Sequence, residues 1–388
     1  MITRDEIREL AAFQSAQGDA VSFYYQPTTP ADKSHRQEAL RIKELVKNAI
    51  REAEKSGKNG KQLKAALERM LAWAENLHGN QGRAKAAFAC GSSGLWKEFD
   101  LPPLLPGTVL HVNTRFHLRP LAAMQDALCT VYIALVERSR ARLFQMQEGE
   151  IREREDFIAA LSRRGRSDGF LGYDAGHADR RVENEALSHL KRVADRLLEL
   201  HQKRGCEQVI FGCREDVWPS MERQLHPYLR ERLVGRFDVD VVSATAEQVR
   251  ERARKMLNAC RDRRRRELVA EVLDEARARR HGAVGLRRVL RSMEQGEVQT
   301  LLMESSFAAP GVYCSNCGHI DMHLVKGCSV CGRETHEIDD ISDALVGLAL
   351  RNGVEIVYVP HDADLQKAGN IAARLRFRAE RRVESVAS

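Results

Sequence analysis

The chain has 388 residues, of which 43% are hydrophobic and 30% charged, and its 62 Lys and Arg against 55 Asp and Glu give a formal net charge of +7. This length predicts two or three domains, because single hydrophobic cores rarely grow past ~250 residues. The composition argues against a membrane-spanning or secreted protein, since no apolar run reaches membrane-spanning length and no signal-peptide pattern is present. We therefore expect a cytoplasmic protein. Its surplus of positive charge, mostly arginine, suits phosphate-rich partners, although most such charges are simply solvated surface residues.

Residues 1–125 are expected to form an N-terminal α/β domain. Its clearest signal is a hairpin, because the turn Gly-Ser-Ser-Gly separates the β-type runs Ala86 to Cys90 and Leu95 to Phe99. The other predicted elements are a helix, a strand, two helices and a last strand. They cover, in order, Arg4 to Phe13, Ala20 to Tyr25, residues 36–77 with a break at Gly57 to Gly60, and Thr108 to Val112. No catalytic constellation stands out in this segment.

Residues 126–260 alternate β-type and α-type patterns, which predicts a layered α/β middle domain. The predicted strands are Cys129 to Val136, Ala141 to Met146, Glu207 to Cys213 and Val239 to Val242. The first predicted helix begins at Val182, and two further helices are predicted for Glu222 to Leu233 and Gln248 to Leu257. Apart from the first two strands, which meet in a turn, each strand is expected to be followed by a helix.

The most distinctive part of this segment is a glycine-rich basic loop that precedes the helix at Val182. Frequent glycines allow a backbone to approach another surface closely, and the arginines have no apolar neighbours to bury them. The residues in question are Gly165, Gly169, Gly172 and Gly176 with Arg163, Arg164, Arg166, Arg180 and Arg181. An ordinary surface loop would look the same, so a cationic finger on a rigid helix is a hypothesis that depends on context.

Residues 261–388 are expected to form a C-terminal α/β domain. The run Arg261 to Arg266 marks its boundary, and a solvated helix start explains this charge at least as well as a phosphate contact does. Helices and strands again alternate. The helices are Glu267 to Arg279, Leu286 to Met293 and Ile341 to Leu350, and the strands are Val298 to Met303, Val354 to Val359 and Ala372 to Phe377.

Four cysteines interrupt this third segment with the spacing of two metal-binding knuckles. They are Cys314, Cys317, Cys328 and Cys331, and Gly318 and Gly332 follow the second cysteine of each pair. Four thiolates at this spacing predict one tetrahedral Zn²⁺ with a structural role, because no position remains open for water. The complete cysteine set makes His319, His323 and His336 unnecessary as ligands, and the five other cysteines follow no disulfide pattern.

Four runs in order along the chain carry a resemblance to a known family. They are Phe116 to Leu121, Val131 to Ile151, Ile341 to Pro360 and Gly369 to Arg378. Together they resemble the bacterial branch of the archaeal-eukaryotic class-1 release factor and Pelota superfamily. The resemblance implies three domains: an N-terminal one directed at the decoding centre, a ribonuclease-H-like middle one directed at the peptidyl-transferase centre, and a ribosomal-protein-like C-terminal one that contacts a translational GTPase. It also implies that residues 312–336 form a zinc ribbon inserted in the third domain.

The resemblance also gives a meaning to the basic loop, where members of the family carry a Gly-Gly-Gln tripeptide. The matching positions are Ala175, Gly176 and His177, followed by Arg181. The hydrolysis of peptidyl-tRNA in the family depends on the glutamine, which is absent here, and the segment 1–125 also lacks the family's stop-codon motif. We therefore expect a factor that occupies the A site of vacant or stalled ribosomes during hibernation or stress, without catalysis.

This expectation includes partners and contacts. The protein would bind ribosomal RNA through the basic residues around the loop and Ala175 to His177, would act as a monomer, and would be accompanied by elongation factor Tu or another translational GTPase. Two other functions stay open at the level of sequence. One is a peptidyl-tRNA-hydrolysing rescue factor that uses His177 with Asp174 or Asp179 as its orienting partner. The other is a nuclease or nucleic-acid-binding zinc protein, although the middle strands carry no acidic residues for a two-metal site.

Overall fold

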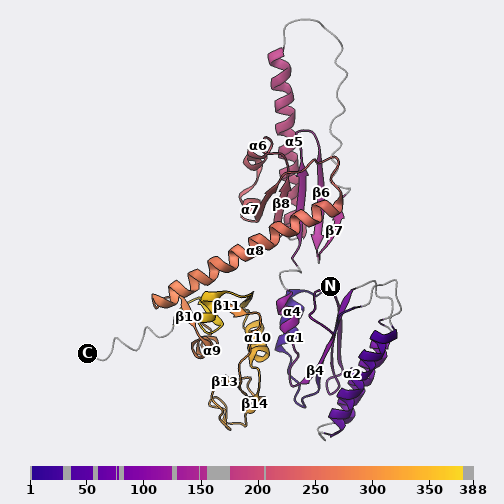
Figure 1. The fold of residues 1–388 in the computed structure, drawn as a ribbon, viewed down its shortest axis with the longest axis vertical. Helices are drawn as coiled ribbons and strands as arrows, with labels where there is room; N and C mark the ends of the chain where they lie inside the picture. The colour runs from indigo at the N-terminus through magenta and orange to yellow at the C-terminus, as the bar shows by residue number, and fades with distance from the viewer. Residues whose placement is uncertain are drawn as a thin grey trace, which may run out of the picture. The chain divides into compact units, whose positions relative to one another are not determined.

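The computed structural model describes residues 2–28, 36–55, 60–75, 77, 83–124, 129–147, 149–154, 175–204 and 207–378. The fold is mixed α/β, as the alternating sequence patterns predict. The chain divides into two compact units (Figure 1). The terminal unit combines Met1–Gln125 with Arg265–Ser388, and the middle unit is Asp126–Arg264. Across the described ranges, none of the helices combines the length and apolar character needed to cross a membrane.

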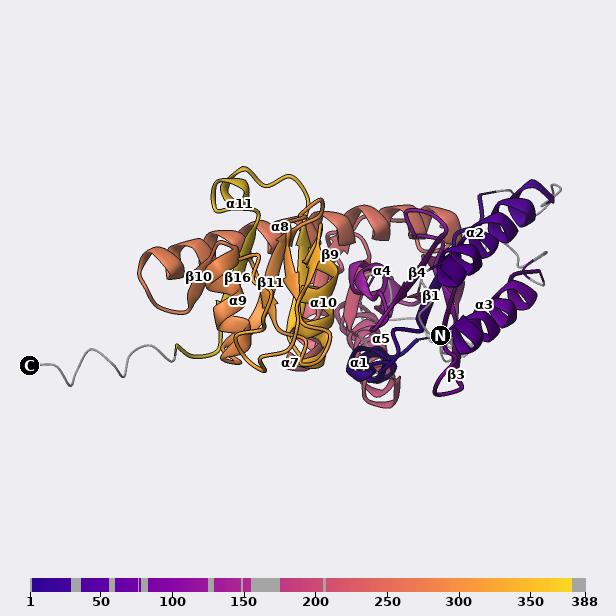
Figure 2. The same cartoon turned by 90° about the horizontal axis from the view of Figure 1, so that it is seen from below.

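The N-terminal part of the terminal unit is an antiparallel sheet with the strand order β3-β2-β1-β4. The strands are β1 (Ala20–Tyr25), β2 (Ala84–Cys90), β3 (Leu95–Leu101) and β4 (Val109–Asn113), and the helices are α1 (Arg4–Ala12), α2 (Arg36–Lys55) and α3 (Gly60–Glu75). The hairpin and the two-helix predictions are confirmed. Figure 2 shows α2 and α3 side by side, and their apolar faces bury Val46, Leu67 and Met70 against Phe23 and Ala87 of the sheet.

The middle unit is built on a five-stranded sheet with the order β7-β6-β5-β8-β9. Its strands are β5 (Val131–Val136), β6 (Ala141–Gln147), β7 (Glu150–Glu153), β8 (Gln208–Gly212) and β9 (Leu233–Phe237). The first three are antiparallel neighbours, whereas β8 runs parallel to β5 and β9 parallel to β8. This unit also contains the long helix that was predicted to follow the basic loop.

Helices cover both faces of this sheet because successive side chains of a strand point to opposite sides. Tyr132 and Ala134 of β5 pack on the side of α5 (Ala175–Arg204), α6 (Trp218–Gln224) and α7 (Pro227–Arg230). Ile133 and Leu135 pack on the opposite side, against the first half of α8 (Ala246–Arg277). All of β5 is therefore buried, which explains its nearly continuous apolar sequence.

Three predicted elements of this region are wrong. The predicted helix Glu222 to Leu233 is two short helices, because Pro227 begins the second of them. The predicted strand Val239 to Val242 does not form, because Leu233–Phe237 takes the place beside β8. The predicted helix Gln248 to Leu257 does not end there but continues into the predicted helix Glu267 to Arg279 as α8, because no glycine or proline interrupts it and arginine is a good helix former. The division between the two compact units still falls inside the run Arg261 to Arg266, where the boundary was predicted.

The C-terminal part of the terminal unit has a sheet of order β10-β16-β11-β15. Its elements are β10 (Gly282–Val284), α9 (Leu286–Glu294), β11 (Val298–Glu304), α10 (Ser342–Arg351), β15 (Glu355–Val359), α11 (Ala363–Lys367) and β16 (Ile371–Leu375). One face packs Leu302 and Ala372 against Val272 of α8 and Leu365 of α11. Between β11 and α10, the cysteine segment forms its own small sheet of β12 (Gly311–Tyr313), β13 (Ile320–Asp321) and β14 (His336–Ile338).

A short segment after β4 joins the two parts of the terminal unit. Phe116 and Leu118 are buried, whereas the residues between and beside them turn their polar groups to the C-terminal part. Arg115 Nε donates to the Tyr313 hydroxyl at 2.7 Å, and His117 Nδ1 lies 2.7 Å from Asp343 Oδ1. Arg119, the first residue of α4 (Arg119–Ala123), reaches Asp340, Ser342 and two backbone carbonyls. We call residues 115–119 the joint.

Candidate functional site

The four predicted ligands form one cluster of sulfur atoms. Cys314 Sγ lies 3.5 Å from Cys331 Sγ, Cys317 Sγ lies 3.5 Å from Cys328 Sγ, and all four sulfurs lie within 4.8 Å of one another. A tetrahedral ion with metal–sulfur bonds of ~2.3 Å has sulfur–sulfur edges of roughly 3.8 Å. The cluster can therefore accept one tetrahedral metal ion with small adjustments of the side chains.

The backbone of each knuckle explains why the spacing brings the sulfurs together. Gly318 N donates to Cys314 O at 2.8 Å, and Gly332 N donates to Cys328 O at 2.9 Å, so both turns close in the same way. The two glycines have φ of +78° and +72°, which other residues rarely adopt. The glycines that follow each second cysteine are thus required by the turn and not by the metal.

Hydrogen bonds distribute the protons unevenly in the cluster. A backbone hydrogen bond from Arg333 and a side-chain bond from Asn316 lower the pKa of Cys331 to about 6. Burial raises the pKa of Cys317 to about 12. A metal ion would thus find the Cys331 thiol easier to deprotonate than the Cys317 thiol, whose proton its own charge would have to displace.

Two of the three neighbouring histidines, His319 and His336, have partners other than the cysteine sulfurs. His319 Nδ1 lies 2.8 Å from Glu294 Oε1, and its Nε2 lies 3.0 Å from Ser329 Oγ. His336 Nε2 lies 3.4 Å from Ser315 Oγ. Within the described residues, the group that can hold a metal ion consists of the four cysteines alone.

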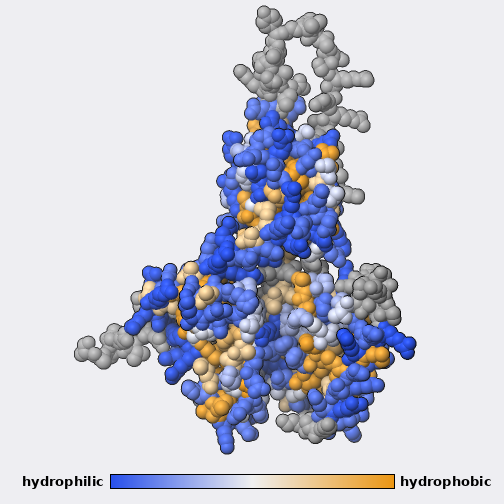
Figure 3. All heavy atoms as spheres, in the orientation of Figure 1, coloured by the Kyte–Doolittle hydropathy of each residue, from blue (hydrophilic) through white to orange (hydrophobic). Residues whose placement is uncertain are grey.

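The cysteine segment has little hydrophobic core of its own. Its buried apolar residues other than cysteine are Val312 and Ile320, whereas Leu324 and Val330 are 65% and 67% exposed. Figure 3 shows apolar atoms on the surface of the segment that holds β13 and β14. Because so small a core contributes little, four metal–thiolate bonds are the interaction best able to hold this segment in shape.

The structure places the residues matched to the family tripeptide differently from the prediction. Helix α5 begins at Ala175 and not at Val182, so Ala175, Gly176 and His177 lie in its first turn, and Arg180 and Arg181 follow in the same helix. The side chains of these five residues lie outside the described ones, and so do Arg163, Arg164 and Arg166 with their whole backbone. Their role therefore stays a prediction.

Among the residues of α5 whose side chains the structure describes, those before His189 are not part of the core of the middle unit. Residues 183–188 are exposed or half-buried, and burial begins at His189 and Leu190, from where Val193 and Leu197 anchor the helix on the sheet. Figure 1 shows this helix extending past the ends of the strands. At 1.5 Å per residue, the stretch from Ala175 to His189 spans about 20 Å.

The sequence analysis missed Asn316, which lies between the first two ligands and hydrogen-bonds the Cys331 thiol. A polar residue inside a Cys-x2-Cys knuckle is the signal that would have pointed to it. It also missed Arg115 and Arg351, which lie close together near Gly318. No local pattern could have paired these two arginines, since they belong to opposite ends of the chain.

Comparison with known proteins gives one family match. Residues 117–258 match the family described as bacterial archaeo-eukaryotic release factor family 10, which covers less than half of the chain. Curated proteins give no match. The match covers the joint from His117 onward, the sheet of the middle unit, α5 and the first part of α8.

Solved structures with similarity include an archaeal translation termination factor, aRF1 (17% identity, 97% of this chain and 99% of that chain, TM-score 0.27). They also include Pelota of Archaeoglobus fulgidus (14% identity, 97% and 93%, TM-score 0.36) and Dom34 of S. cerevisiae (11% identity, 77% and 82%, TM-score 0.40). At these TM-scores the likenesses carry no argument of their own. The family match is therefore a likeness of residues 117–258, which hold most of the joint and of the middle unit, to a bacterial family of archaeo-eukaryotic release factors.

Proposed function

We propose that this protein is a ribosome-binding translation factor that occupies the A site of vacant or stalled ribosomes without hydrolysing peptidyl-tRNA. The observation that carries the proposal is the match of residues 117–258 to a release factor family, in a chain whose tripeptide position reads Ala175-Gly176-His177. The family's glutamine is missing at this position, and the first glycine is replaced by alanine. A protein of this architecture that lacks the hydrolytic glutamine is suited to occupying the A site without catalysis.

The start of α5 supports this proposal. Helix α5 begins at Ala175, its residues 183–188 are exposed or half-buried, and the buried residues that anchor it on the sheet begin at His189 and Leu190. The arrangement suits a rigid arm that carries the basic loop to a distant surface.

The topology of the middle unit supports a ribonuclease-H-like domain. If its strands are numbered along the chain, they lie side by side in the order third, second, first, fourth, fifth. The first three strands pair antiparallel with one another, and the fourth and fifth run parallel to the first. We infer the same three-domain division as the sequence implies, with boundaries near residues 125 and 260. The cysteine segment would then be a zinc ribbon with a structural Zn²⁺, because four thiolates favour Zn²⁺ and leave no open position for chemistry.

The functional counterpart that we propose is Balon, a hibernation factor of this superfamily that lacks Gly-Gly-Gln and enters the vacant A site alongside elongation factor Tu. By this analogy the chain would act as a cytoplasmic monomer in a stress response, with elongation factor Tu or another translational GTPase as its companion. Its affinity would come from arginine contacts with RNA phosphates, with Arg163, Arg164 and Arg166 as the first candidates.

The test is cosedimentation of the purified protein with vacant ribosomes at several salt concentrations, with a parallel assay for peptide release from peptidyl-tRNA. We expect binding that falls steeply with salt, and no release. In the double variant Arg163→Gln/Arg164→Gln, loss of two phosphate contacts should reduce the slope of log affinity against log salt by about 2. The matched control is Lys191→Gln/Arg192→Gln, two exposed residues on α5 with the same charge change.

Each outcome bears on the proposal. Equal weakening in both double variants would assign binding to net charge and remove the loop from the proposal. Peptide release that disappears in His177→Ala would establish the rescue enzyme instead. Absence of ribosome binding at every salt concentration would refute the proposed function.

A further inference from the structure

Two arginines from distant parts of the sequence point at the same place in the terminal unit. Arg115 belongs to the joint and Arg351 is the last residue of α10. A Cβ atom built on Gly318 would lie 3.3 Å from Arg351 Nη2 and 3.5 Å from Arg115 Nη2. The two guanidinium groups therefore converge above the backbone of the first cysteine knuckle, where a glycine leaves room for them.

Among the described residues, no carboxylate forms an ion pair with either guanidinium. Arg115 donates to the Tyr313 hydroxyl, to Phe13 O at 3.5 Å and to the side chain of Gln14, all of them neutral acceptors. Arg351 is half-buried, and in the part of the chain that the structure describes it has no hydrogen bond or ion pair. Burial and the charge of Arg115 lower the pKa of Arg351.

The carboxylates around the same cavity are paired elsewhere or lie on the surface. Asp19 accepts hydrogen bonds from Ser15 and Ser92, Asp340 accepts from Arg119, and Asp343 faces His117. Glu52, which also lines the cavity, is an exposed residue of α2. Two positive charges thus remain side by side with no counter-ion, which is unfavourable unless an anion fills the gap.

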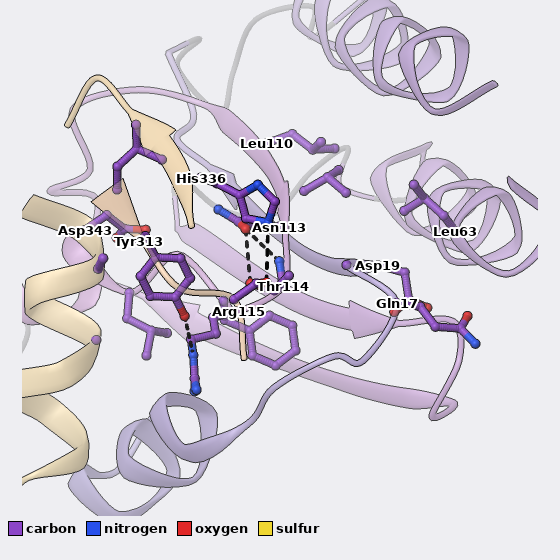
Figure 4. A pocket seen from close by; sticks show the side chains of 18 of the residues that line it. Gln17, Asp19, Leu63, Leu110, Asn113, Thr114, Arg115, Tyr313, His336 and Asp343 are labelled. Carbon is purple, nitrogen blue, oxygen red and sulfur yellow. Dashed lines mark hydrogen bonds between the residues drawn. The ribbon is translucent and has the colours of Figure 1, made fainter. Parts of the chain in front are cut away.

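The space beside these arginines can hold a ligand. The cavity has a volume of about 1130 Å³, and Arg115, Arg351, Tyr313, Ser315, Thr114 and His336 are among its lining residues. Figure 4 shows Tyr313 and Arg115 joined by their hydrogen bond, with His336 and Thr114 nearby. Hydroxyl groups and an imidazole beside two guanidinium groups form a donor-rich wall.

We propose that Arg115 and Arg351 form a binding site for a phosphate group. Guanidinium groups donate two parallel hydrogen bonds to phosphate oxygens, and a pair of them can hold one phosphate from two sides. The Tyr313 hydroxyl can add a further donor once Arg115 moves to the anion. The phosphate can be a free or small-molecule phosphomonoester or a phosphodiester of an RNA backbone, and the chemistry of recognition is the same for both. The site does not depend on the proposed ribosome binding.

The test uses Arg351→Gln in the full chain, because Arg115 also holds the joint and its loss would disturb the unit. Thermal unfolding is followed against increasing inorganic phosphate, with sodium chloride at equal ionic strength as the reference. The matched control is Arg287→Gln on α9, an exposed arginine with the same charge change. A second arm measures the fluorescence anisotropy of a labelled eight-nucleotide single-stranded RNA.

We expect saturable stabilisation of the unaltered chain and of Arg287→Gln by phosphate, and an apparent affinity at least tenfold weaker in Arg351→Gln. Without phosphate, Arg351→Gln should unfold at the same or a higher temperature than the unaltered chain, because it removes the repulsion from Arg115. A phosphate response confined to RNA, and lost in Arg351→Gln alone, would identify the phosphodiester as the source. The proposal is overturned if Arg351→Gln responds like the control in both arms, or if it lowers the unfolding temperature without phosphate.

Discussion

Replacing Arg119 by methionine should destabilise the terminal unit by about 2–4 kcal/mol, because this side chain is the most connected polar group of the joint. Its Nη1 donates to Asp340 Oδ2 at 3.2 Å and to Ser342 Oγ at 2.7 Å, and its Nη2 donates to the carbonyls of Ser305 and Phe307 at 3.0 and 3.2 Å. Hydrogen bonds from a charged donor contribute about 1.5–3 kcal/mol each when buried.

The summed free energy of four such hydrogen bonds overestimates the destabilisation by Arg119→Met for two reasons. The bond to the Ser305 carbonyl is exposed, so water replaces it in the variant. Asp340 and Ser342 also keep two hydrogen bonds to each other, at 2.8 and 2.7 Å, when the guanidinium is gone. Methionine preserves most of the aliphatic packing, so the estimate reflects the lost polar contacts.

The assay is urea unfolding followed by tryptophan fluorescence in a Trp218→Phe background. Trp73 and Trp96, whose rings lie 6.1 Å apart, then report on the N-terminal part of the terminal unit alone. The control is Arg8→Met, which removes an exposed arginine with one 3.5 Å ion pair and should change the free energy of unfolding little. If Arg119→Met unfolds at the same urea concentration as Arg8→Met, the polar contacts of the joint do not stabilise the unit and the reasoning fails.

Three further predictions concern the metal, a buried ion pair and pH. Cys331→Ser should reduce bound zinc, measured by elemental analysis, from one equivalent to less than half, and unchanged zinc content would contradict the tetrahedral site. Glu297 is fully buried, with its Oε2 3.2 Å from Arg288 Nη2, so Glu297→Gln should lower the free energy of unfolding by about 3–5 kcal/mol in urea titrations; a loss below 1 kcal/mol would refute this. Burial lowers the pKa of His189 in the fold, so the unfolded chain binds the proton more tightly and stability is lost as pH falls through about 6.5. His189→Leu should flatten this loss between pH 7.5 and 5.5, and an unchanged pH dependence of urea unfolding would exclude the imidazole as its source.

Elements with a strong local signal could be predicted from the sequence. The Gly-Ser-Ser-Gly turn between two β-type runs gave the hairpin of β2 and β3, and the cysteine spacing gave the sulfur cluster. Both signals are local, since the residues that decide the structure lie within a few positions of one another. The strand β1 and the helices α1 and α10 were also found within one or two residues of their observed ends.

Elements that depend on strand pairing or on the continuity of a helix could not be predicted from the sequence. Leu233–Phe237 and Val239 to Val242 both consist mainly of apolar residues, and only the pairing with β8, in which Leu233 faces Val209, selects the first as a strand. The charged run Arg261 to Arg266 contains the division between the two compact units, yet it does not end α8, because charge does not end a helix that has neither glycine nor proline. The strands β7 and β10 have four and three residues, which is too short for a periodic pattern, so they exist only through their neighbours.

A run of sequence that resembles a family can have a structural role and no part in the chemistry, and the joint is an example. Phe116 to Leu121 was one of the runs that pointed to a release factor family, and in the structure it alternates between residues buried in the N-terminal part and polar groups that bind the C-terminal part. Its resemblance therefore reports how the two ends of the chain are held together. Under the proposed function, chemistry would instead be sought at the first turn of α5, where Ala175, Gly176 and His177 lie, and a factor that kept the architecture while changing that turn would keep binding and lose hydrolysis.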